Sequence, residues 1–200
     1  AVQGGVWVVA MPIYAWVVYT ILDMIAGLEE GNADPDMDRS RLGWYRAITL
    51  IWAPVQVVTL FGLIWYVTRA DHLSALEMWA LFFGMGVASG TIGINYSHEL
   101  MHQRPRLDRW LGDILLAMVL YSHFRSEHLL RQSLVSAWKA EAAMLARKSL
   151  PAWDLSNPFW RYAALQGGML LLAILLGGWV GIVLFLVQAA TAIWQLELVN

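Results

Sequence analysis

The sequence has no cysteine and few charged residues. Without cysteine, the 200-residue chain cannot form a disulfide, a thiolate metal site or a cysteine-ligated iron–sulfur centre. Any electrons that it uses must therefore come from a separate carrier. Charged residues make up 14% of the chain, against about 25% in soluble domains. Because 59% of the residues are hydrophobic and the mean hydropathy is +0.54, most of the surface must face lipid instead of water.

Two further absences narrow the classes of protein. The basic residues form no dense patch interleaved with exposed aromatic residues, so no binding to nucleic acid is expected. The opening residues lack the basic segment of a signal peptide, and the chain begins at Ala1, so a natural N-terminus further upstream is expected.

Long uncharged runs predict an all-α, polytopic transmembrane helix bundle. A bilayer core about 30 Å thick needs about 20 apolar residues in a helix. We expect a single integral membrane domain, 1–200, with spans at about 1–27, 47–68, 77–97, 159–176 and 179–198 and a shorter membrane or interfacial helix at 110–124. The last two spans share one uncharged run, 162–196, which Gly177 and Gly178 divide because glycine permits a tight reversal.

The positive charges predict how the chain is oriented. If the first span starts outside, 12 of the 13 lysine and arginine residues lie on the inner side and only Arg69 lies outside. This asymmetry predicts that the end of the third span faces the cytoplasm. Within that span Gly86 and Gly90 are four residues apart, a spacing that favours close approach of another helix.

The stretch His98-Glu99-Leu100-Met101-His102 is the sharpest motif. Histidines four apart on a helix share one face, so both imidazoles can reach one metal ion. Ionisable residues where a span meets the interface are functional by default. The alternative is a chance HxxxH at a helix end with hydrated rings.

A second cluster, residues 121–128, follows the next hydrophobic helix and contains His123 and His128. Their five-residue spacing does not put both on one helical face, so we expect His128 as a metal ligand. His123 and Glu127 are expected to support the ligands. Imidazoles suit iron, zinc or copper, and donor softness does not choose among these metals. His72 lies on the other side of the membrane and is not expected in the site.

The 12 tryptophans and six phenylalanines suggest a hydrophobic substrate channel, although such residues more often form interfacial belts. Tyr14 and Trp16, in the first span, are the candidate channel residues.

The run from Asn95 to His128 resembles the bacterial membrane-bound alkane 1-monooxygenases, which show a HELxH box, a basic segment with D/ERW, a hydrophobic helix and a GHF-x-x-EH box. The likeness continues in ILDMIAG (21–27), RAITLIWAPVQ (46–56), SAWKAEAAMLARKSLPAWDLSNP and WQLELVN (194–200). His98 and His102 match the first box, and His128 matches the first histidine of the second.

This resemblance implies six membrane helices in the bacterial inner membrane and a cytoplasmic-side histidine cluster that binds two irons. It implies terminal hydroxylation of medium-chain n-alkanes to 1-alkanols with O2, and rubredoxin, reduced by rubredoxin reductase and NADH, as the electron donor. The family's second box continues as EHxxxHH. Here His128 is followed by Leu129–Gln132, and the paired histidines are absent. The later NxxH and QRHSDHH boxes and the helix before the first span are absent too. We expect a longer protein; a truncated, inactive relative is the alternative.

Other function classes stay open on the sequence. A membrane zinc metalloprotease would use Glu99 as the general base of HExxH, but no third zinc ligand stands at a familiar offset. Fatty-acyl desaturases and hydroxylases share the histidine-box chemistry. A membrane scaffold or transporter is the non-enzymatic alternative, which no pair of broken helices supports. Iron would favour an oxygenase, and zinc a protease.

Overall fold

The computed structural model describes residues 2–27, 43–125 and 134–199, and every regular element within these ranges is helical. The expected fold class, an all-α polytopic bundle, is confirmed. In chain order the elements are η1 (Gly5–Val9), α1 (Ala10–Ile13), η2 (Tyr14–Val18), α2 (Tyr19–Ala26), α3 (Gly43–Val67), α4 (Ala75–Ala88), η4 (Ser89–Ile94), α5 (Asn95–Met101), α6 (Arg106–Met118), η5 (Ser122–Arg125), α7 (Leu134–Ala146) and α8 (Pro158–Val199).

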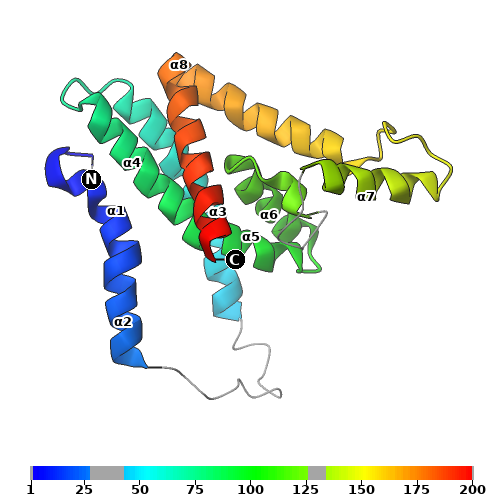
Figure 1. Ribbon diagram of the computed structural model, residues 1–200, viewed down its shortest axis with the longest axis horizontal. Coiled ribbons are helices and arrows are strands. Elements are labelled where there is room, and N and C mark those ends of the chain that lie inside the picture. The colour runs from blue at the N-terminus through cyan, green and yellow to red at the C-terminus, as the bar shows by residue number, and fades with distance from the viewer. Residues whose placement is uncertain (1, 28–42, 126–133, 200) are drawn as a thin grey trace.

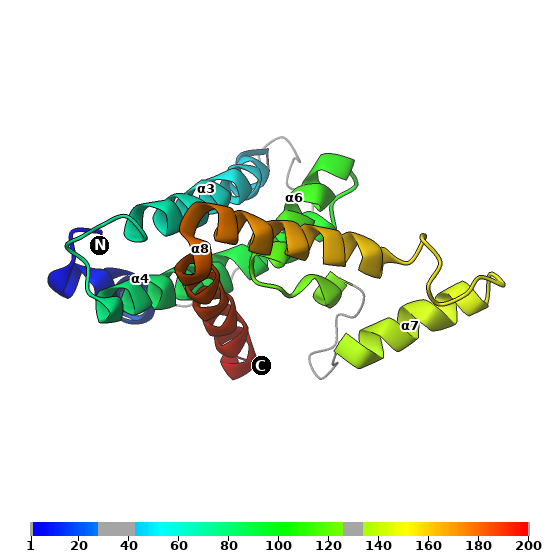
Figure 2. The same ribbon diagram turned by 90° about the horizontal axis from the view of Figure 1, so that it is seen from above.

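Among the described residues, four helical stretches are long and apolar enough to cross a bilayer. They are Gly5–Ala26, Gly43–Val67, Ala75–Met101 and Pro158–Leu198. The third stretch runs through α4, the π-helical η4 and α5 without a break. The chain is thus a multi-pass membrane protein. Both α3 and α4 pack against α8. In Figures 1 and 2, α7 lies at the end of the molecule away from the N-terminus.

The longest helix, α8, is bent at Gly178. This residue has φ 58° and ψ −145°, which no residue inside a helix adopts. The two arms of α8 diverge from this point (Figure 1). Next to the bend, a side chain on Gly177 would come within 2.7 Å of Ile64, and one on Gly181 would meet the carbonyl oxygen of Ala173. The break lies in the expected place, whereas the division into two full spans stays a prediction.

The core of the bundle lies where α4 and α8 pack closely together. A side chain on Gly86 would come within 2.6 Å of the Gln188 carbonyl, and one on Gly90 within 3.0 Å of the Ala192 carbonyl. The predicted close approach at these glycines is confirmed. Phe61 and Phe185 stack in the centre with ring centroids 6.1 Å apart.

Buried polar side chains link the helices inside this apolar core. Gln56 receives a hydrogen bond from Trp52 at 2.6 Å and donates one to Ser89 of η4 at 3.2 Å. Gln188 of α8 donates to the Met118 carbonyl at the end of α6, at 2.6 Å. In lipid such groups must be satisfied by the protein itself, so these bonds fix which helix faces meet.

Candidate metal centre

The candidate metal centre begins where the third apolar stretch ends. The π-helical turn η4 leads directly into α5, and π-helical turns occur frequently at functional sites. Within α5, Leu100 and Met101 are buried, whereas His98, Glu99 and His102 are exposed. The helix therefore turns its apolar face to the bundle and its histidine face outward.

Packing against α6 holds α5 in this orientation. Ser97, fully buried, donates a hydrogen bond to the Gly112 carbonyl at 3.0 Å. A side chain on Gly112 would come within 3.1 Å of the Ser97 carbonyl and 3.3 Å of Leu100. Glycine at position 112 thus lets the two helices approach closely enough to fix the rotation of α5.

The two histidines of this helix point toward each other. The Nε2 atoms of His98 and His102 are 3.3 Å apart, and their ring centroids are 4.7 Å apart. Two imidazole nitrogens bound to one ion at about 2.1 Å each lie roughly 3.0–3.4 Å apart for bond angles of about 90–110°. The observed separation fits two donors to a single metal ion, the arrangement expected from the four-residue spacing.

The described part of the second cluster, residues 121–125, returns beside this pair. After α6 the chain turns at Leu120, which has a φ of 56°, and enters η5. The Phe124 ring lies 6.2 Å from the His98 ring, and Tyr121 stacks on Phe124 at 5.6 Å. His123 in turn packs against Tyr121 at 4.5 Å. Phe124, Tyr121 and His123 thus form a row of ring contacts that begins at His98.

Tyr121 also belongs to the candidate site, although the spacing of residues in the sequence gave it no role. Burial raises its pKa, and the neighbouring Glu197 carboxylate raises it further by charge and by a hydrogen bond. Tyr121 therefore remains a neutral phenol that donates to Glu197. The contact brings the C-terminal end of α8 to the histidine face. The only signal in the sequence is that both residues lie in stretches of family likeness.

The remaining predicted residues are placed as follows. Glu99 is exposed on the same turn as the histidines. His128 and Glu127 lie outside the described residues, so their roles as ligand and supporting residue stay predictions. Within the described ranges, no group of three or more His, Cys, Asp or Glu residues is close enough to hold a metal. Two of the three predicted ligands are thus brought together in the part of the chain that the structure covers.

Tyr14 and Trp16 pack on neighbouring aromatic rings at the periphery. Tyr14 meets Tyr19 at 5.7 Å, and Trp16 meets Phe83 of α4 at 5.8 Å. Both are partly exposed, at 49% and 43%. Their proposed part in a substrate channel stays a prediction. His72 lies beyond the opposite end of α4, where its Nε2 is 3.0 Å from the Val2 carbonyl oxygen.

The chain is similar to curated bacterial enzymes over nearly its whole length. It is 30% identical to alkane 1-monooxygenase 2 and 29% identical to alkane 1-monooxygenase 1, both of Pseudomonas aeruginosa, over 97% of the chain and 59% of each relative. It is 26% identical to the alkane 1-monooxygenase of Ectopseudomonas oleovorans, over 98% of the chain and 54% of that relative. No protein-family model matches the chain. These relatives confirm the resemblance, and the chain belongs to the alkane 1-monooxygenase family.

The lengths of these alignments are informative too. The chain spans less than two thirds of the length of these relatives. The alignments with the two Pseudomonas aeruginosa enzymes run over 238 and 231 positions, more than the 200 residues of the chain. The relatives therefore carry residues between the matched stretches that have no counterpart in this sequence.

Proposed function

We propose that this chain is part of a membrane-bound, non-haem iron monooxygenase that hydroxylates the terminal methyl group of medium-chain n-alkanes. The observation that carries the proposal is the His98–His102 pair, whose Nε2 atoms converge to 3.3 Å at the end of an apolar span. A histidine pair of this kind could serve an oxygenase or a protease, and the names of the relatives favour the oxygenase. A protease reading of HExxH receives no comparable support.

The residues that would hold the metal are His98 and His102, and His128 would add a third donor. The complete protein is expected to bind two iron ions. When bound, iron supplies the oxidative chemistry: one atom of O2 enters the terminal C–H bond as the hydroxyl oxygen, and the other leaves as water with two electrons and two protons.

The described residues contribute the positioning of the two imidazoles. Buried Leu100 and Met101 anchor α5, so that the imidazoles of His98 and His102 are held one turn apart without rearrangement. Phe124 packs beside His98, with the two ring centroids 6.2 Å apart. The apolar helices let an alkane reach the site from the bilayer, in which it dissolves.

The electron donor is proposed to be rubredoxin, reduced by rubredoxin reductase and NADH. The proposal fits the 200 residues given, which contain no cysteine to hold an iron–sulfur centre of their own. We further propose that the protein lies in the bacterial inner membrane with the histidine face on the cytoplasmic side. The distribution of the 13 lysine and arginine residues supports this orientation.

The test uses the purified full-length protein. With rubredoxin, its reductase, NADH and an n-alkane, we expect the 1-alkanol as product, carrying one oxygen atom from isotopically labelled O2, and iron in the metal analysis. His98→Ala and His102→Ala should each lose the metal and lower activity by more than about 100-fold, since changes beside a metal already cost 10–100-fold.

His72→Ala is the matched control, because it removes an imidazole on the other side of the bundle, and it should keep both metal and activity. Iron content unchanged in His98→Ala would exclude His98 as a ligand. Zinc in place of iron, with no alkanol formed, would exclude the monooxygenase.

A further inference from the structure

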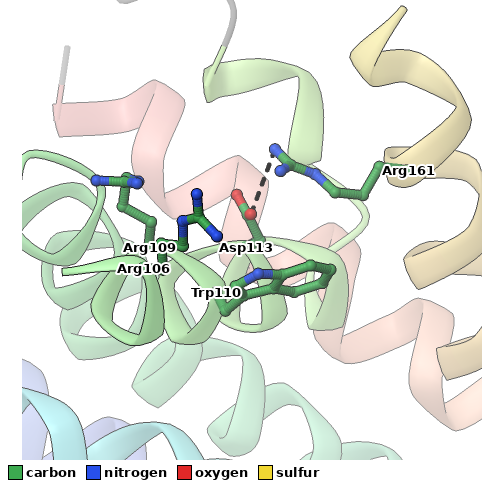
Figure 3. A pocket seen from close by; sticks show the side chains of 5 residues that line it. All are labelled: Arg106, Arg109, Trp110, Asp113 and Arg161. Atoms are coloured by element: carbon green, nitrogen blue, oxygen red, sulfur yellow. Dashed lines mark ion pairs between the residues drawn. The ribbon is translucent and has the colours of Figure 1, made fainter. Parts of the chain in front are cut away.

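A second polar site lies between α6 and the start of α8. It is a cavity of about 290 Å³ lined by Arg106, Arg109, Trp110, Asp113 and Arg161. In Figure 3, Asp113 lies between Arg161 on one side and Arg106 and Arg109 on the other, with the Trp110 ring below. Nothing in the proposed oxidation uses these residues.

The lining of this cavity is strongly cationic. Three guanidinium groups face one carboxylate, and that carboxylate is already engaged, since Arg161 Nη2 lies 3.3 Å from Asp113 Oδ2. The Asp113 side chain is almost fully buried. Within the described part of the chain, the lining of the cavity therefore holds more guanidinium groups than carboxylates, and Arg106 adds positive charge to the Arg161–Asp113 pair, which favours an anionic ligand.

The side chain of Arg161 is held in place with donor capacity left over. Its guanidinium stacks on Trp110 at 5.6 Å and on Tyr162 at 5.7 Å. Among the described residues, its buried Nε–H has no acceptor. On the opposite wall, Arg109 is fixed by hydrogen bonds from its Nη1 to the carbonyls of Gln103 and Arg104. A guanidinium group that is fixed in place with an N–H donor to spare, as Arg161 is, suits the oxygen atoms of a phosphate group.

The position along α8 gives the depth of this cavity in the membrane. Arg161 is the last charged residue before the uncharged run 162–196. Trp110, at the cavity mouth, is 47% exposed. Tryptophan and arginine at the end of an apolar span mark the level of the lipid headgroups. Basic pockets between helices at that level bind the phosphate groups of anionic lipids.

We propose that this cavity binds the phosphate group of an anionic membrane phospholipid. Arg106 supplies positive charge outside the internal ion pair, Arg161 supplies its unsatisfied Nε–H donor, Arg109 forms the opposite wall, and Trp110 lies along the upper acyl chain. Along the chain, the short loop between α5 and α6 separates this site from the histidine pair. It does not depend on the proposed oxidation.

The experiment measures lipid retention by the full chain. Protein is released from nanodiscs that contain phosphatidylcholine and phosphatidylglycerol, and the bound lipids are counted by native mass spectrometry. The parent protein should retain phosphatidylglycerol in preference to phosphatidylcholine. Arg106→Gln and Arg161→Gln should each lower that preference about fivefold, the effect of one basic residue at an anionic surface.

Arg104→Gln is the matched control, because it removes an exposed arginine from the same loop without touching the cavity, and it should leave lipid preference unchanged. Arg106 is exposed, so Arg106→Gln remains informative if Arg161→Gln fails to fold after Asp113 loses its partner.

Three results would overturn the proposal. Equal losses in Arg106→Gln and Arg104→Gln would mean a diffuse charge effect without a site. Binding of inorganic phosphate that phosphatidylglycerol does not displace would identify a free anion as the ligand. Unchanged lipid preference combined with a raised KM for a soluble electron carrier would identify the patch as a protein-docking surface.

Discussion

The convergence of His98 and His102 follows from backbone geometry. Residues four apart lie one turn from each other, and their side chains leave the helix on the same face. Burial of Leu100 and Met101 then decides that this face points away from the bundle. Helical spacing thus brings the two imidazoles together, and packing of α5 against the bundle determines the direction in which they point.

Single glycines decide how closely the helices approach. We expect Gly86→Ala to destabilise the protein by about 1–3 kcal/mol, the usual cost of overpacking, because the new methyl group would lie 2.6 Å from the Gln188 carbonyl. Thermal unfolding in detergent measures the effect. Gly62→Ala, where a methyl group meets nothing within 4 Å, is the control and should not lower the melting temperature. Equal melting temperatures for the two variants would contradict the close α4–α8 contact.

Arg46 and Asp108 join two elements, α3 and α6. Arg46 donates from Nε and Nη2 to the two carboxylate oxygens of Asp108 at 2.8 and 2.9 Å. Asp108 is fully buried, whereas the Arg46 side chain is 49% exposed. We expect Arg46→Gln to destabilise more than Asp108→Asn, because it leaves a buried carboxylate unpaired, at a cost of about 1–3 kcal/mol. A double-mutant cycle on melting temperature measures the coupling, and additive effects would contradict it.

The same ion pair makes stability depend on pH. The hydrogen bonds from Arg46 lower the pKa of Asp108 below its ordinary value, against the opposing effect of burial. A carboxylate whose pKa is lowered by folding stabilises the protein above its unfolded pKa of about 3.9, and this contribution is lost as the pH falls through the folded pKa. The melting temperature should therefore fall more steeply below about pH 4 in the parent protein than in Asp108→Asn. Parallel curves would show that Asp108 does not contribute.

Helix α8 changes direction through one residue. Gly178 has φ 58° and ψ −145°, a conformation that costs other residues about 1–3 kcal/mol. Gly178→Ala should lower the melting temperature although its side chain would meet nothing within 4 Å. Gly168→Ala, equally open but inside the helical arm, should not. A Gly178→Ala variant as stable as the parent would show that the bend is not specified by this glycine.

Elements were easier to predict from the sequence than the contacts between them. The apolar runs, the pair of glycines at 177 and 178 and the HELMH spacing are local patterns, and each has its counterpart in the structure. The Arg46–Asp108 and Tyr121–Glu197 contacts join residues far apart in the sequence, and no periodicity pairs them. The start of α6 at Arg106, four residues before the expected helix, depends on charged residues that a search for apolar runs passes over.

For the whole molecule, the polar links inside the bundle and the charges at its ends act in different ways. Gln56 and Gln188 tie helices together within the apolar layer and fix their packing. The lysine and arginine residues fix orientation, since 12 of the 13 fall on the side of the histidine pair when the spans alternate. Orientation is therefore open to a test that leaves the packing untouched.

The absence of cysteine makes that test direct. Ser149→Cys and Asp71→Cys each place one thiol at an exposed position, and both keep all the positive charges that set orientation. If the histidine face is cytoplasmic, a membrane-impermeant maleimide should label Asp71→Cys in spheroplasts and Ser149→Cys only in inverted vesicles. The parent chain, without a thiol, gives the background. The reverse pattern would place the histidine pair outside, where a cytoplasmic electron carrier could not reach it, and the proposed reaction would lose its source of electrons.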